Sequence, residues 1–143
     1  PSAYETYEIL RFVGEAIDEA GRAVEVPEEV SALIESIAAQ LGRLSSEPSA
    51  TDFEYWDRVH DALEVYRSAT EATFSGKLVA WEPARLGRST GVLGAMLARM
   101  DQGFKRALTF ASNGVVPTYF KFTVTKYELT GATSSRGLPT VKV

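Results

Sequence analysis

The chain of 143 residues contains no cysteine and only one histidine. The lack of cysteine excludes disulfide bonds, iron–sulfur clusters, thiolate zinc sites and a cysteine nucleophile. The longest strongly apolar stretch, around residues 92–97, is far shorter than the ~20 residues that span a bilayer. The two glycine-rich phosphate-binding patterns, G-x-x-x-x-G-K-[ST] and G-x-G-x-x-G, do not occur in the sequence. The sequence therefore predicts no cofactor, no metal site and no membrane partner.

The composition is that of a folded domain. Hydrophobic residues make up 45% of the chain and charged residues 24%, a balance that favours a globular protein over a disordered one. The length suits one domain with a single core. The acidic N-terminal stretch lacks the basic region and apolar segment of a signal peptide. The expected location is therefore the cytoplasm or an assembled particle.

Charge is distributed unevenly along the chain. Residues 1–76 carry sixteen Asp and Glu against five Lys and Arg, a net charge of −11, whereas residues 77–143 carry three against ten, a net charge of +7. The total of −4 hides this difference. Either the two halves neutralise each other within one fold, or the acidic face of one molecule meets the basic face of another.

Four segments have apolar residues at helical spacing, which predicts helices at about residues 3–20, 28–42, 51–74 and 89–111. Thr51 and Glu54 form a capping-box pattern, and Gly21 and Gly42 are expected to end the first two helices. The expected core stripe of the first helix is Ile9, Val13, Ala16, Ile17 and Ala20. That of the third is Phe53, Trp56, Val59 or His60, Leu63 and Tyr66. The fourth has the longest stripe and is expected to be the central helix.

The apolar period changes from 3.6 to 2 after Pro117. This alternation predicts a strand at residues 119–129, a turn at 130–137 and a returning strand at 138–143. A short strand is also expected at residues 78–81, and residues 24–26 are expected to be an extended link. The predicted fold class is α+β: a mainly helical layer of about four helices, residues 1–114, followed by a C-terminal antiparallel β-hairpin, residues 115–143, in a single domain.

A two-stranded hairpin alone is marginally stable in water. The strand at residues 119–129 would therefore need either the segment at 78–81 or a strand from another chain to cover its edge. We predict that this hairpin is an interaction surface. Its candidate residues are Tyr119, Phe120, Lys121, Phe122, Val124, Lys126, Tyr127, Val141 and Val143.

Two short patterns raise the alternative that the protein is an enzyme, either a hydrolase or one chain of a two-chain enzyme. Gly87, Ser89 and Gly91 match the G-x-S-x-G nucleophile elbow of α/β-hydrolases. In that family the histidine follows the serine, whereas His60 precedes it here. The pattern instead favours Ser89 or Thr90 as a helix cap.

His60 lies three residues after Asp57, the spacing found in half of a carboxylate-bridged di-metal site. A second histidine is required to complete such a site, and the chain has none. His60 shares a face with Phe53 and Trp56, which predicts a half-buried structural histidine. The acidic residues beside it are typical of a solvated helix face.

The basic half of the chain raises a third alternative, a nucleic-acid-associated subunit. Its basic residues include Arg85, Arg88, Arg99, Lys105, Arg106, Lys121, Lys126, Arg136 and Lys142. The acidic total and the lack of a recognition motif argue against this alternative. The leading prediction is a non-enzymatic structural subunit of a homo- or hetero-oligomer, which binds protein subunits through complementary charged halves and the C-terminal strand edge.

Overall fold

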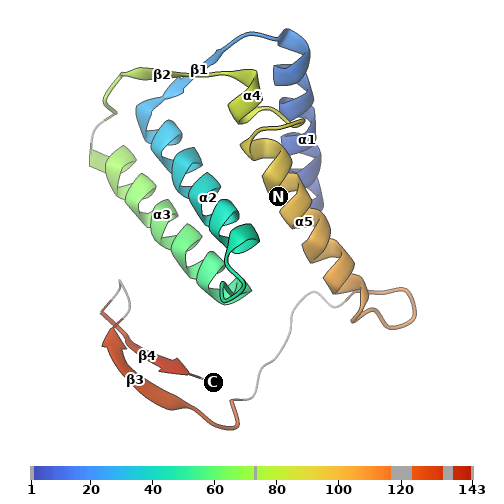
Figure 1. The fold of residues 1–143 in the computed structure, drawn as a ribbon, viewed down its shortest axis with the longest axis vertical. Coiled ribbons are helices and arrows are strands. Elements are labelled where there is room, and N and C mark those ends of the chain that lie inside the picture. The colour runs from blue at the N-terminus through green and yellow to red at the C-terminus, as the bar shows by residue number, and fades with distance from the viewer. Residues whose placement is uncertain (1, 73, 117–123, 134–136, 143) are drawn as a thin grey trace. The chain divides into compact units, whose positions relative to one another are not determined.

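The computed structural model describes residues 2–72, 74–116, 124–133 and 137–142. The chain divides into two compact units, Pro1–Lys105 and Arg106–Val143, which are described in turn (Figure 1). Within the described residues, the elements are α1 (Ala3–Ala20), β1 (Val24–Pro27), α2 (Glu28–Ser46), α3 (Asp52–Ala72), β2 (Leu78–Trp81), α4 (Pro83–Leu86), α5 (Val92–Leu108), β3 (Glu128–Thr133) and β4 (Pro139–Lys142). The predicted α+β class with a C-terminal antiparallel hairpin is confirmed.

Local signals at the helix ends explain where two of the long helices begin. Ser2 Oγ accepts a hydrogen bond from the Glu5 backbone N–H, and the Glu5 carboxylate accepts one from the Ser2 backbone N–H at 2.7 Å. Thr51 and Glu54 make the same reciprocal pair at the start of α3, with distances of 3.0 and 3.1 Å. The predicted capping box is therefore confirmed. Gly21 ends α1 in the left-handed conformation, with a φ of 60°, as expected.

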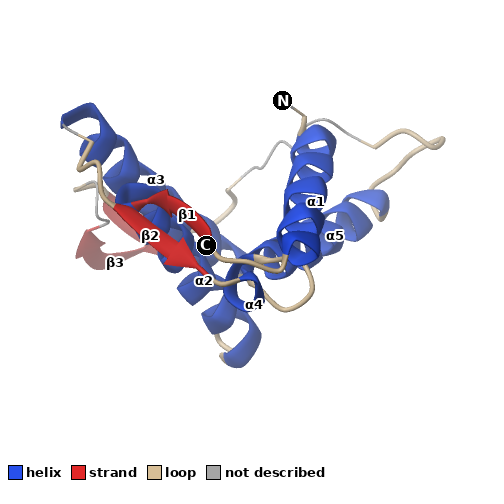
Figure 2. Ribbon diagram, turned by 90° about the horizontal axis from the view of Figure 1, so that it is seen from above, coloured by secondary structure: helices blue, strands red, loops and turns tan. Residues whose placement is uncertain are grey.

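A two-stranded ribbon joins the helical parts of the first unit (Figure 2). β1 pairs with β2 in antiparallel register, so that Val24 lies opposite Trp81 and Pro27 opposite Leu78. The prediction of an extended link at residues 24–26 is corrected, because this segment is a strand. The segment at 78–81 is a strand as expected, but within the described residues its partner is β1. It therefore does not complete the C-terminal sheet.

The core of the first unit lies beside this ribbon. Trp81 is 1% exposed and forms a cluster with Ile17, Leu86 and Leu93. The indole N–H of Trp81 donates a hydrogen bond of 2.9 Å to the hydroxyl of Ser31, which is also buried. Its one polar group is therefore satisfied, as burial requires. The cluster ties α1, α2, α4 and the start of α5 to the ribbon.

The helix boundaries and the position of α5 differ from the prediction. α2 continues through Gly42 to Ser46, because a glycine ends a helix only where the chain turns into the left-handed region. α3 ends at Ala72, slightly before the predicted end. α5 buries only Leu93 and Leu97, both in its first half. The prediction that it is the central helix is wrong, because the second half has no buried residue within the described part of the chain.

The second unit contains the C-terminal hairpin. Glu128 lies opposite Lys142, Leu129 opposite Val141, and the register shifts before Thr133 meets Pro139. β3 thus begins nine residues later than the predicted strand and continues into the predicted turn. Residues 124–127 form no strand, and residues 117–123 lie outside the described residues. All described residues of β3 are exposed.

Candidate interaction surfaces

Among the described residues, four ion pairs connect the acidic half of the chain with the basic half. They link Glu28 with Lys77 at 3.6 Å, Glu35 with Arg85 at 3.5 Å, Asp52 with Arg99 at 2.9 Å, and Glu15 with Arg88. Exposed pairs of this kind contribute little stability individually. Together they show that part of the charge asymmetry is neutralised within one chain. Residues 106–143, in contrast, carry five basic residues and one acidic residue.

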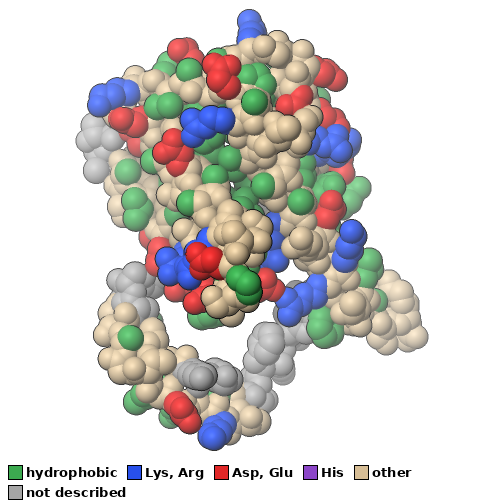
Figure 3. All heavy atoms as spheres, in the orientation of Figure 1, with side chains coloured by type: hydrophobic (Ala, Val, Ile, Leu, Met, Phe, Trp, Pro, Cys, Tyr) green, Lys and Arg blue, Asp and Glu red, His purple; other side chains and the backbone are tan. Residues whose placement is uncertain are grey.

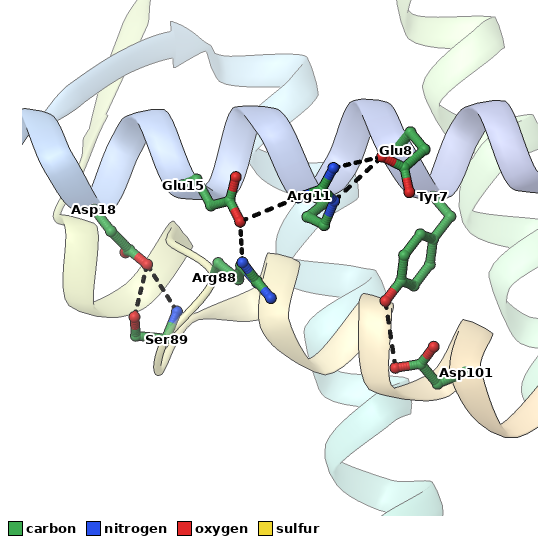
Figure 4. A network of polar contacts seen from close by, with 8 residues as sticks. All are labelled: Tyr7, Glu8, Arg11, Glu15, Asp18, Arg88, Ser89 and Asp101. Carbon is green, nitrogen blue, oxygen red and sulfur yellow. Dashed lines mark hydrogen bonds and ion pairs between the residues drawn. The ribbon is translucent and has the colours of Figure 1, made fainter.

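One side of α1 is held to the turn before α5 by polar contacts (Figure 4). The Arg88 side chain pairs with Glu15, which also contacts Arg11 at 3.5 Å. Arg11 in turn binds Glu8 at 2.6 Å, and this hydrogen bond raises the pKa of the Arg11 guanidinium. The charges along this side of α1 are therefore engaged within the chain.

Ser89 also takes part in these polar contacts between α1 and the turn before α5, which are called the clamp below. Its backbone N–H and its hydroxyl both donate to the Asp18 carboxylate, at 2.9 and 2.8 Å. The Thr90 hydroxyl donates to the Ala84 carbonyl at 2.9 Å, and the Gly91 carbonyl accepts the first backbone bond of α5, from Ala95. The prediction that Ser89 or Thr90 caps this helix is therefore wrong, because Gly91 occupies the cap position.

The partner of Ser89 also bears on the enzyme alternative. A serine nucleophile requires a general base that accepts its proton, usually an imidazole oriented by a third group. The Ser89 hydroxyl contacts a carboxylate instead, and the single histidine of the chain is on α3. Within the described residues no group of three or more His, Cys, Asp or Glu could hold a metal ion.

We expect Asp18→Ala to lower the free energy of unfolding by about 1–2 kcal/mol, because it removes both charge-assisted hydrogen bonds from Ser89. Ser89→Ala keeps the backbone bond and should cost about 0.5 kcal/mol. Urea unfolding followed by circular dichroism measures both values. Ser68→Ala, at an exposed position of α3, is the control. Equal effects of the three substitutions would contradict the clamp, and labelling of Ser89 by a fluorophosphonate would support the hydrolase alternative.

Tyr7 and Phe104 connect the middle of α1 to α5. Their rings meet edge to face with centroids 5.7 Å apart, and the Tyr7 hydroxyl donates to Asp101 at 3.5 Å. Burial raises the pKa of the Tyr7 phenol, and the negative charge of Asp101 raises it further. The contact fixes which side of α1 is turned toward the rest of the unit.

A groove of about 470 Å³ lies between α2 and α5. Small apolar side chains such as Ala38, Ala95 and Ala98 line it, together with Arg85 and Arg99. Both arginines already pair with carboxylates of the same chain. The groove therefore offers a ligand a concave apolar surface, but both of its arginines are already paired with carboxylates.

The opposite side of α1 carries an exposed apolar row. Phe12 is 70% exposed, and Ile9, Val13, Ala16 and Ala20 are exposed as well. These five residues are called the α1 apolar face below. Of the stripe expected in the core, only Ile17 is buried. The prediction is wrong for Ile9, Val13, Ala16 and Ala20.

Close packing at Gly14 explains why the side of α1 that carries Gly14, and not the α1 apolar face, is turned toward the rest of the unit. A Cβ atom added to Gly14 would lie 2.9 Å from Cβ of Arg88, so only glycine lets the two segments approach this closely. Phe12 was missed by the sequence reasoning. The available signal was that α1 has two apolar arcs, one through Leu10 and Ile17 and one through Phe12 and Ala16, whereas one helix side suffices for a core.

α3 also exposes residues that were expected in the core. Phe53 is 71% exposed and Trp56 is 54% exposed, so the prediction that they are buried is wrong. His60 stacks on Trp56 with ring centroids 5.4 Å apart, and its Nε2 lies 3.7 Å from Glu64. The prediction of a half-buried histidine is confirmed, since one third of its side chain is exposed.

The structure describes part of the predicted C-terminal interaction surface. Val124, Lys126, Tyr127 and Val141 are described, and all four are exposed. The remaining candidates, Tyr119, Phe120, Lys121, Phe122 and Val143, lie outside the described residues. Leu129, which was not among the candidates, is exposed beside Val141.

In the described part of the chain, no helix combines the length and apolar character needed to cross a bilayer. Comparisons with protein-family models, with curated proteins and with solved structures found no match. The face of the first unit drawn in Figure 3 shows apolar side chains among charged ones.

Proposed function

We propose that this protein is a non-enzymatic structural subunit of a homo- or hetero-oligomeric complex. The α1 apolar face is the observation that carries the proposal. Single exposed apolar residues are normal on protein surfaces, whereas a contiguous row favours an interaction site. Phe12 is the largest side chain of this row, and its ring would be withdrawn from water by a partner.

The dimensions of the α1 apolar face suit a helix or strand of another subunit. From Ile9 to Ala20 it spans about 16 Å, at 1.5 Å per residue. Ile9, Phe12, Ala16 and Ala20 are spaced by three or four positions, with Val13 next to Phe12, which is the pattern that packs against a second helix. Burying a side chain such as Ile9 or Phe12 stabilises a complex by about 1.5–3 kcal/mol.

The role of charge in this proposal is narrower than the sequence suggested. The four ion pairs within the chain already engage part of both halves. Residues 1–105 carry eighteen acidic and ten basic residues, a net charge of −8, whereas residues 106–143 carry a net charge of +4. The basic residues of the second unit accompany the exposed residues Tyr127 and Leu129. We retain the C-terminal strand edge as a second surface of the proposed subunit.

We expect the native mass of the wild type to exceed the 15.6 kDa of one chain, because the α1 apolar face is covered by another subunit. Phe12→Asp should weaken association by about thirtyfold, the effect of losing a 2 kcal/mol hot spot. Sedimentation equilibrium over a protein concentration series measures both. Tyr4→Asp is the matched control, since Tyr4 is exposed on α1 outside this face.

Equal effects of Phe12→Asp and Tyr4→Asp would show that association uses another surface. A wild type that is monomeric at every protein and salt concentration would overturn the homo-oligomeric form of the proposal and leave only a complex with a different chain. Circular dichroism of both variants checks that α1 still forms. An exposed aspartate on a helix is expected to leave the helical signal unchanged, because its propensity cost is well below 1 kcal/mol.

A further inference from the structure

The outer side of α3 carries a ladder of three rings. Phe53 and Trp56 have centroids 5.9 Å apart, and Trp56 and His60 stack at 5.4 Å with an interplanar angle of 20°. The three residues follow one another at helical spacing and form a single row. This row is called the α3 ring ladder below.

The ladder faces away from the rest of the first unit. α3 packs against α2 through Ala62, Tyr66 and Ala69, which line a shared cavity with α2 residues. At 100° per residue, the side of α3 that carries these residues lies across the helix from the ladder. In Figure 1, α3 forms the outer edge of the unit. Phe53 and the part of Trp56 that His60 does not cover are therefore available to a partner.

Acidic side chains accompany the ladder. Asp57, Asp61 and Glu64 follow one another at helical spacing beside it, and Glu64 already pairs with Arg67 at 2.7 Å. α3 as a whole contains six acidic and two basic residues, a net charge of −4. The ladder thus combines exposed aromatic rings with a helix of net negative charge.

The same combination already binds arginine twice within this chain. The Arg85 guanidinium lies 4.3 Å from the centroid of Trp81 and pairs with Glu35. The Arg99 guanidinium lies 5.2 Å from that of Tyr55 and pairs with Asp52. In each case an aromatic face and a nearby carboxylate hold one guanidinium. Among the described residues, no arginine lies over Trp56.

We infer that the α3 ring ladder binds an arginine-bearing segment of a partner protein. A guanidinium would lie against the exposed part of Trp56 that His60 leaves uncovered while its charge meets the acidic row, and the apolar part of the segment would cover Phe53. Tryptophan gives the strongest such stacking. The inference concerns a surface separate from the α1 apolar face and does not depend on it.

Charge distinguishes this occupant from others that could stack on the rings. Nucleic-acid bases stack on aromatic side chains, but their phosphates need a positively charged groove, and α3 has a net charge of −4. A second copy of α3 would bring the same negative charge to the contact. A basic protein segment is the occupant that satisfies both the rings and the carboxylates.

The probe is a fluorescein-labelled helical peptide with arginines on one side and leucines on the other. Its matched control has citrulline, which is uncharged and similar in shape, at every arginine position. Fluorescence anisotropy measures the affinity of each peptide for the full chain. We expect the citrulline peptide to bind at least tenfold more weakly. We also expect binding of the arginine peptide to weaken as salt increases.

Variants locate the contact. We expect Trp56→Ala to weaken binding of the arginine peptide by about five- to thirtyfold. Trp56→Leu keeps the apolar bulk and loses the ring, so its affinity for the arginine peptide should be close to that of Trp56→Ala. The double variant Asp57→Asn with Asp61→Asn should reduce both the affinity and its salt dependence. Phe12→Ala, on α1, is the control and should change the affinity by less than about twofold.

Several outcomes would overturn the inference. They are equal binding of the citrulline peptide, no effect of Trp56→Ala, tighter binding of a single-stranded oligonucleotide than of the arginine peptide, and no saturable binding up to about 1 mM peptide. Circular dichroism shows whether each variant is folded. Because the native mass responds to Phe12 and the peptide to Trp56, failure of this inference and failure of the proposed function are read separately.

Discussion

Replacement of Trp81 by alanine is expected to lower the free energy of unfolding by about 3–5 kcal/mol, the usual cost of truncating a buried aromatic side chain. Trp81 is 1% exposed and packs from the ribbon into the core formed with α1, α2, α4 and α5. The substitution leaves a cavity in the small core and leaves Ser31 without its buried partner. Because domains of this size are stable by only about 5–15 kcal/mol, a large part of the total would be lost.

Urea unfolding followed by far-ultraviolet circular dichroism is the appropriate measurement, since the substitution removes a fluorescent residue. Trp56→Ala is the matched control. The chain has two tryptophans, and Trp56 is exposed, so its loss should cost less than about 1 kcal/mol. Similar costs for the two substitutions would contradict the core described for the first unit.

Two glycines of α5 are expected to respond to alanine with opposite signs. A Cβ atom at Gly94 would lie 2.0 Å from the carbonyl oxygen of Arg88, and this oxygen belongs to backbone that cannot move aside easily. Gly94→Ala should therefore destabilise the protein by about 3 kcal/mol through overpacking. At Gly103 an added Cβ meets open space in the described part of the chain. Gly103→Ala should stabilise the protein by about 0.5–1 kcal/mol, because alanine favours the helix interior.

Thermal unfolding of the wild type and both variants, recorded at one pH and one salt concentration, tests this pair. The matched design removes the common effect of helix propensity, since both substitutions are glycine to alanine in one helix. The difference between the two variants reports the packing of Arg88 against α5. If both substitutions stabilise the chain, α5 does not approach the turn before it as closely as described.

The two proposed surfaces, the α1 apolar face and the α3 ring ladder, are exposed for the same reason. Trp81, Gly14 and Gly94 draw the inner sides of α1 and α5 onto the ribbon and the turn around Arg88. The core is small, and it buries only one side of each long helix. Apolar residues on the other sides, such as Phe12 and Trp56, therefore remain exposed. An assembly in which partners cover these sides would remove the exposed apolar side chains from water.

The sequence by itself determined the features that depend on near neighbours. The long helices, the Thr51–Glu54 capping box, the end of α1 at Gly21 and the C-terminal hairpin were all predicted. Each arises from interactions within a few residues: apolar periodicity, a side chain that caps a backbone N–H, or a glycine in the left-handed conformation. The hairpin class was predicted while its strand boundaries moved, because alternation specifies a strand more clearly than its ends.

Only the tertiary structure decided which residues meet across long stretches of the chain. The pairing of β1 with β2, the contact of Asp18 with Ser89 and the bond from Trp81 to Ser31 each join residues about 50 or more positions apart. Periodicity shows that α1 and α3 have apolar sides, but it cannot show which side the core covers. That choice depends on the close approach at Gly14 and on the limited size of the core, which leave Phe12 and Trp56 exposed because no further element of the first unit packs over them among the described residues.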